Sequence, residues 1–94
     1  MSEDKRSQQR RRVLKDGSVL LPGSRVTYDC AIRDMNESGA KFRLKIDSIT
    51  LPSEFELIFV SEGTAYPARL MWQRGSEAGV MFDGPPRSVK VRIY

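Results

Sequence analysis

The sequence predicts an all-β fold: a small antiparallel β-barrel of six or seven strands, preceded by a flexible basic N-terminal arm. Three observations carry this prediction. Apolar and polar residues alternate with a period of two in one segment after another, turn residues separate these segments at spacings of about 8–12 residues, and no segment shows a sustained helical period. We favour a barrel over a sandwich or an open sheet because closure removes the exposed edges and gives the aromatic side chains a common interior.

The first two expected strands cover residues 13–21 and 25–35. Gly17 marks a bend or bulge in the first strand, and the turn pair Pro22-Gly23 ends it. The second strand alternates cleanly, as a half-buried strand does. Its inward face is expected to hold Val26, Tyr28, Cys30 and Ile32.

A hairpin turn is expected at residues 36–39, where Gly39 is the natural residue for a positive φ. The chain then returns along residues 40–46. In this return strand the apolar residues again occupy every second position, so the two strands form a hairpin. The inward residues are expected to be Ala40, Phe42, Leu44 and Ile46.

Three further strands are expected over residues 54–59, 64–74 and 78–82. Pro67 places the first half of the fifth strand at an edge, because proline cannot donate to a sheet ladder. Residues 85–94 form a short C-terminal strand or tail. The inward residues are expected to be Phe55, Leu57 and Phe59 in the fourth strand, and Tyr66, Ala68, Leu70 and Trp72 in the fifth.

The charge of the chain is concentrated at its N-terminus. Residues 1–15 carry six basic and two acidic side chains, whereas residues 16–94 carry ten of each. We therefore divide the chain into a flexible basic ligand-binding arm at 1–12, a barrel at 13–84 and the tail at 85–94. Clustered guanidinium groups on a neutral body favour a localised contact with an anion, although a solvated charge run has the same composition.

The composition argues against several classes of protein. The chain has no histidine and a single cysteine, Cys30, so an intrachain disulfide is excluded and a metal site is not expected. Cys30 lies on the apolar face of its strand and is interpreted as a core thiol rather than a nucleophile. We expect no catalytic residues and no cofactor. No apolar run is long enough to span a bilayer and no secretory leader is seen, which favours a cytoplasmic protein.

Two local patterns lie in order along the chain. The first is Arg6-x-x-x-Arg10 in the arm, and the second is Asp34-x-Asn36-x-x-Gly39 in the hairpin turn, with 23 residues between Arg10 and Asp34. Each pattern is common by itself. Together, in a β-barrel of this length, they resemble the PilZ domain, a bacterial receptor module for the second messenger cyclic di-GMP. The family pattern has Ser where this chain has Asn36.

The resemblance implies that the ligand is cyclic di-GMP and that Arg6, Arg10, Asp34, Asn36 and Gly39 bind it. The chemistry is consistent with this: an arginine can donate to O6 and N7 of guanine together, while a second arginine pairs with a phosphate. Asp34 can accept from guanine N–H groups or a ribose hydroxyl, and Gly39 allows close approach of the backbone. Secondary candidates in the arm are Lys5 and Arg11.

These observations favour a non-enzymatic cyclic di-GMP receptor in which ordering of the arm is the signal to an unidentified downstream protein. One alternative is a ligand-blind PilZ-like scaffold that acts through protein contacts alone, and Asn36 is its best support. The other is a nucleic-acid-binding barrel, which requires stacking aromatic side chains on the barrel exterior beside the arm. This alternative is less favoured because most aromatic residues fall in the inward sets.

Overall fold

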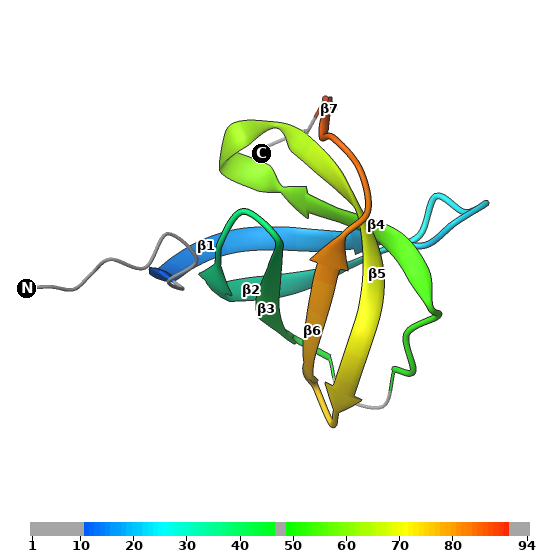
Figure 1. The fold of residues 1–94 in the computed structure, drawn as a ribbon. Helices are drawn as coiled ribbons and strands as arrows, with labels where there is room; N and C mark the ends of the chain where they lie inside the picture. Colours follow the sequence, from blue (N-terminus) through cyan, green and yellow to red (C-terminus); the bar gives the residue numbers. More distant parts are fainter. Residues whose placement is uncertain (1–10, 47–48, 91–94) are drawn as a thin grey trace, which may run out of the picture.

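The computed structural model describes residues 11–46 and 49–90, which form a closed antiparallel β-barrel (Figure 1). The predicted all-β fold is thereby confirmed. Six strands close the barrel in the order β4-β1-β2-β3-β6-β5, with β5 pairing back onto β4, and a short seventh strand lies beside β5. The elements are β1 (Arg11–Leu20), β2 (Thr27–Met35), β3 (Gly39–Leu44), β4 (Glu54–Phe59), the 3-10 turn η1 (Val60–Glu62), β5 (Thr64–Arg74), β6 (Glu77–Phe82) and β7 (Arg87–Ser88).

Strand β1 begins at Arg11, two residues before the expected start of the first strand. Its register with β2 shifts between Arg12 and Lys15, so the irregularity lies there and not at Gly17. Gly17 is instead a site of close packing, since a Cβ added to it would lie 2.6 Å from Cδ1 of Ile32. The glycine therefore lets β1 lie against the side chain of Ile32.

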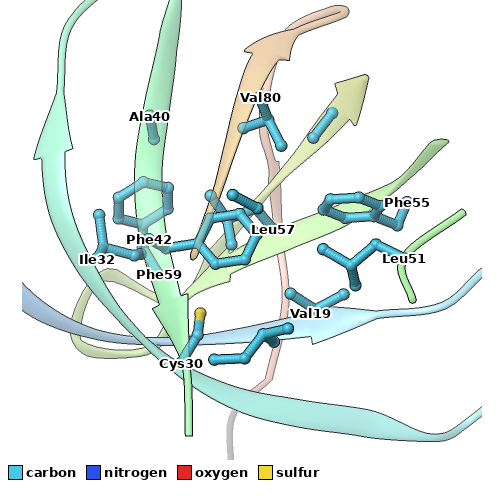
Figure 2. Packing of buried hydrophobic residues seen from close by; sticks show 13 residues of the cluster. Val19, Cys30, Ile32, Ala40, Phe42, Leu51, Phe55, Leu57, Phe59 and Val80 are labelled. Atoms are coloured by element: carbon cyan, nitrogen blue, oxygen red, sulfur yellow. The ribbon is translucent and has the colours of Figure 1, made fainter. Parts of the chain in front are cut away.

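The barrel interior holds one apolar cluster, in which Phe42, Phe59, Ile32, Leu57, Val19 and Cys30 are the largest fully buried side chains (Figure 2). The inward residues predicted for the central parts of the strands are confirmed there. Cys30 is a buried core thiol as predicted, and burial, helped by the charge of Asp29, raises the pKa of its thiol to about 12.

Two residues expected to face inward are exposed. Val26 is 49% exposed and Ile46 is 53% exposed. Val26 precedes the first residue of β2 and Ile46 follows the last residue of β3. Each lies in a connection beyond the ladder, where the alternation of a strand no longer sets the direction of the side chain.

The C-terminal part of the described chain is held against the barrel by β7. Thr64 and Ala65 of β5 pair with Ser88 and Arg87. The guanidinium of Arg87 also donates two hydrogen bonds to the carboxylate of Glu56 on β4, at 2.8 and 2.7 Å. Across the part of the chain that the structure describes, no helix has the length and apolar character needed to cross a membrane.

Candidate functional site

The loop that joins β2 to β3 is shaped by the side chain of Asn36. Its Oδ1 accepts hydrogen bonds from the backbone N–H groups of Ser38, at 2.7 Å, and of Gly39, at 2.9 Å. The backbone N–H of Asn36 donates to the carbonyl oxygen of Gly39 at 2.9 Å. An Asn side chain that accepts from nearby backbone N–H groups is a common means of stabilising a turn. Asn36 therefore builds the turn in which the candidate motif lies.

Gly39 is explained by close packing between strands, and the expectation that it has a positive φ is wrong. The turn is closed by the Asn36 side chain, and Gly39 is already the first residue of β3. A Cβ added to Gly39 would overlap the carbonyl oxygen of Val80 and lie 3.2 Å from Cα of Met81. Glycine therefore lets the hairpin tip lie directly against the backbone of β6.

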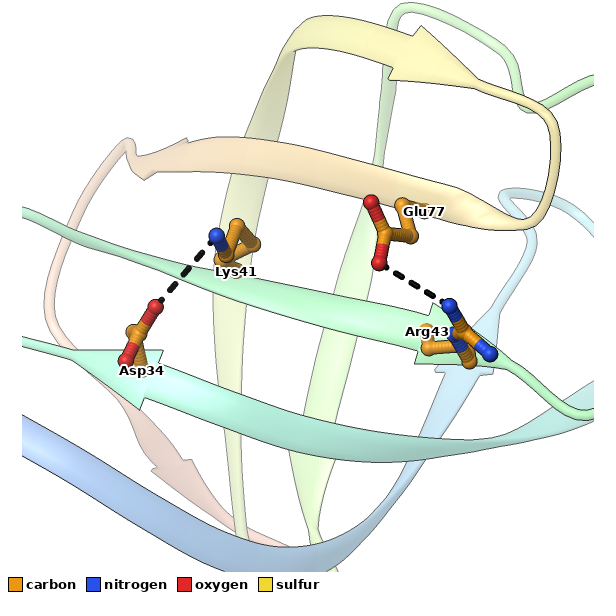
Figure 3. A network of polar contacts seen from close by, with 4 residues as sticks. All are labelled: Asp34, Lys41, Arg43 and Glu77. Carbon is orange, nitrogen blue, oxygen red and sulfur yellow. Dashed lines mark hydrogen bonds and ion pairs between the residues drawn. The ribbon is translucent and has the colours of Figure 1, made fainter.

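A β-bulge at Arg33 sets the direction of the Asp34 side chain. The register between β2 and β3 shifts between Ile32 and Asp34, which leaves Arg33 as the extra residue. The extra residue changes the phase of the alternation, so Met35 and not Asp34 packs against the core. Asp34 lies on the outer face, with Oδ2 3.6 Å from Nζ of Lys41 (Figure 3).

Asp34 belongs to a row of paired residues that crosses five strands of the barrel. Arg12 on β1 pairs with Asp34, Asp34 pairs with Lys41 on β3, Lys41 pairs with Gly79 on β6, and Gly79 pairs with Trp72 on β5. Residues directly opposite one another in neighbouring strands lie on the same face of a sheet. The row therefore connects the start of β1, beside the basic N-terminal segment, to a tryptophan on β5.

Trp72 faces outward, and the expectation that it shares the inward face with Leu70 is wrong. The register between β5 and β6 shifts between these two residues, which makes Met71 the extra residue of a second bulge. Trp72 is 40% exposed. Its indole lies against the backbone of Gly79, since a Cβ added there would lie 2.7 Å from Cε2 of the ring.

A surface depression of about 300 Å³ lies between the β2–β3 loop and this indole. Its polar wall is the hairpin turn, and its apolar wall is formed by exposed side chains of β5 and β6. The residues concerned are Asn36, Ser38 and Gly39 on the loop, and Met71, Trp72 and Met81 on the strands. Such a site offers a base or another flat ring one aromatic surface and several backbone and amide polar groups.

A comparison with protein-family models matches residues 4–93 to the PilZ domain. The chain belongs to the PilZ family. The match covers nearly the whole chain, and the closed six-stranded barrel with its additional strand is consistent with a PilZ-like barrel. A comparison with curated proteins found no match.

Three of the basic residues predicted for the site of this PilZ domain lie outside the described residues, namely Lys5, Arg6 and Arg10. Of Arg11 the structure describes the backbone, which pairs with Met35 at the end of β2. The three predicted residues of the hairpin, Asp34, Asn36 and Gly39, lie together at its tip. The described part of the basic segment and the hairpin motif therefore occupy the same end of the barrel.

Sequence reasoning missed Lys41, Trp72 and Gly79 as parts of this surface. Lys41 belonged to the outward set of its strand and carried no motif. For Trp72 a signal existed: Leu70-Met71-Trp72 is a run of three large apolar residues, and such a run has no period of two. That run is consistent with a bulge. Whether Trp72 faces the interior or the exterior of the barrel then depends on the pairing with the partner strand.

Proposed function

We propose that this PilZ domain is a non-enzymatic receptor that binds cyclic di-GMP at the β2–β3 hairpin and needs no cofactor. The observation that carries the proposal is the row across the outer face, which presents the carboxylate of Asp34 and the exposed indole of Trp72 on one surface. A cyclic dinucleotide has two purine faces for stacking, two guanine edges for hydrogen bonding and two phosphates. The surface and the arginines together offer partners for each kind of group.

The arginine motif supplies the phosphate and guanine contacts in this proposal. Arg10 is bonded to Arg11, whose backbone pairs with Met35, and Met35 is followed directly by Asn36 of the turn. Arg6 and Arg10 are thus joined to β1 at the end of the barrel that bears the depression. One arginine would donate to O6 and N7 of a guanine, and the other would pair with a phosphate.

Trp72 supplies the stacking surface. Base–aromatic stacking contributes about 1–3 kcal/mol per base, which makes one exposed indole beside a hydrogen-bonding loop a substantial part of a ligand site. The ring is held against Gly79 rather than projecting freely, so little side-chain freedom is lost when a base stacks on it.

The signal in this proposal is the ordering of residues 1–10 over the bound ligand, which creates a surface for a downstream protein in the cytoplasm. A ligand can drive such a change if it binds the ordered arrangement more tightly than the others. Arg11 and Arg12, which were predicted to lie in the arm, belong to β1 in the structure.

One observation favours a second candidate, a barrel that binds single-stranded nucleic acid. That function requires exterior aromatic side chains beside the basic segment, and Trp72 meets the requirement. Among the aromatic residues that the structure describes, however, Trp72 alone is exposed. A single indole held against Gly79 offers little stacking surface, which suits a small ligand better than a strand.

The decisive experiment uses Trp72 as a reporter, because it is the only tryptophan in the chain. We expect its fluorescence to change on titration with cyclic di-GMP, with saturation, and to respond weakly to GTP and single-stranded RNA. Isothermal titration of the same protein gives the stoichiometry. No response to cyclic di-GMP from the folded native protein would refute the receptor function and leave the scaffold, and a stronger response to RNA would support the second candidate.

A further inference from the structure

Lys41 lies at the centre of the row that crosses the candidate site. It projects from β3 on the same outer face as Asp34, and its Nζ is 3.6 Å from Oδ2 of that carboxylate (Figure 3). This separation is longer than a hydrogen bond, and the side chains are 41% and 18% exposed. A partly exposed ion pair at this separation contributes little to stability, so the ammonium, the more exposed of the two groups, can turn toward a ligand at small cost.

The two groups form a defined pattern of donor and acceptor. The ammonium of Lys41 only donates hydrogen bonds, and the ionised carboxylate of Asp34 only accepts them. The Watson–Crick edge of guanine carries the complementary pattern, with O6 as an acceptor beside the donors N1–H and N2–H. Adenine carries the amino group N6–H₂ and the acceptor N1 at the corresponding positions. The ammonium of Lys41 would then face the donor N6–H₂, and the carboxylate of Asp34 would face the acceptor N1, so neither contact could form.

We propose that Lys41 and Asp34 together recognise the Watson–Crick edge of one guanine, with Lys41 donating to O6 and Asp34 accepting from N1–H and N2–H. The inference rests on the proposed receptor function and adds Lys41 to it as a specificity-determining residue. O6 has two lone pairs, so the contact with Lys41 is compatible with an arginine at the other edge of the same base. Lys41 pairs with Gly79, on which the indole of Trp72 lies, so the hydrogen-bonding pair and the stacking surface are adjacent in the row.

The chain contains a matched control for Lys41. Arg43 lies two residues further along β3, faces the same side and also carries one positive charge. Its guanidinium pairs with Glu77 at 3.1 Å and is 54% exposed (Figure 3). Arg43 is further from the hairpin tip, and it pairs with Glu77 on β6 whereas Lys41 pairs with Gly79 beside the indole of Trp72. Lys41→Met and Arg43→Met therefore remove the same charge from the same strand. The first change is at the proposed site and the second is at the control position.

The experiment compares the affinity of the native protein and these two variants for cyclic di-GMP and for cyclic di-AMP, which differ only in their bases. We expect Lys41→Met to weaken binding of cyclic di-GMP about tenfold, as for loss of a hydrogen bond to a charged group, without weakening that of cyclic di-AMP. The preference for guanine should fall by the same factor. Arg43→Met should leave both affinities within about twofold, as for a solvated charge removed from outside the site.

Two results would overturn the role of Lys41 while leaving the receptor intact. One is an equal loss for both ligands in Lys41→Met, which would assign Lys41 to the shared phosphates. The other is identical behaviour of the two variants. Failure of the native protein to bind cyclic di-GMP would instead overturn the receptor function and this inference with it, so the two failures are distinguishable. Circular dichroism of each variant confirms that the barrel is retained.

Discussion

The indole of Trp72 lies against the backbone of Gly79, in space that any other residue at position 79 would fill with its Cβ. This contact holds an exposed aromatic ring on the outer face of the barrel, beside the β2–β3 turn. The ring is thereby placed for stacking without being buried. The absence of a side chain at Gly79 and the bulge at Met71 are both needed for this arrangement.

We predict that Gly79→Ala displaces the indole and weakens binding of cyclic di-GMP about tenfold, which corresponds to part of one base–aromatic stack. The new Cβ would meet ring atoms of a 40% exposed side chain, which can move into solvent, so the barrel should remain folded. The emission maximum of Trp72 and the affinity from isothermal titration are the measurements. An unchanged affinity with a shifted emission maximum would show that the ring does not contact the ligand.

We predict that Gly39→Ala is much more damaging to stability than Gly17→Ala. The Cβ at position 39 would overlap backbone atoms of β6, whereas the closest atom to the Cβ at position 17 is the end of the Ile32 side chain. Overpacking costs about 1–3 kcal/mol, and we expect Gly39→Ala at the upper end of this range. Urea unfolding of both variants measures the difference. Equal losses would mean that the hairpin tip moves away from β6 as easily as a side chain rotates.

We predict that Asn36→Ala destabilises the hairpin turn by about 1–2 kcal/mol, because two backbone N–H groups lose the oxygen that accepts from them. Asn36→Ser should recover part of this loss, since a hydroxyl oxygen can accept in the same turn but has a shorter reach. Thermal unfolding ranks the three proteins. For ligand affinity we expect Ser to retain or improve on the native value. If neither the native protein nor Asn36→Ser binds cyclic di-GMP although both are folded, the ligand-blind scaffold is favoured.

For the basic segment we predict that Arg6→Ala and Arg10→Ala each weaken binding about tenfold to a hundredfold, the effect of losing one bidentate contact of about 1–3 kcal/mol. Arg25→Ala is the control, because it removes the same charge from the exposed loop before β2, at the opposite end of that strand from the hairpin turn. Isothermal titration gives the three affinities. Similar losses in all three variants would indicate a diffuse electrostatic attraction and no specific arginine site.

The pair formed by Arg87 and Glu56 predicts that attachment of β7 depends on pH. The hydrogen bonds from Arg87 lower the pKa of the Glu56 carboxyl below its ordinary value of 4.5. A carboxyl with a lowered pKa in the folded state stabilises the protein above its unfolded-state pKa, and that stabilisation is lost as the pH falls through the folded-state pKa. We expect Arg87→Gln to lower the Tm at pH 7 and to leave it unchanged in strongly acidic buffer. A difference that persists in acid would assign the effect to packing of the Arg87 side chain.

How much the sequence could predict is best seen at Cys30 and Trp72. Alternation placed Cys30 in the core correctly, because β2 is regular around it and pairs on both sides without a shift. The same rule placed Trp72 in the core wrongly, because the bulge at Met71 reverses the alternation of β5 between Leu70 and Trp72. The hairpin residues Asp34, Asn36 and Gly39 were singled out from their spacing and lie together at the hairpin tip, whereas the expected positive φ of Gly39 was wrong.

The sequence by itself determined the β-barrel, the positions of its strands and the family to which its motifs point. These depend on local properties: period-two alternation, turn residues and the order of short motifs along the chain. Only the tertiary structure decided which faces Asp34 and Trp72 occupy and that Lys41 and Gly79 lie between them. Bulges at Arg33 and Met71 exist because one strand has an extra residue relative to its partner, and the pairing partner of a strand is a property of the closed barrel rather than of the segment.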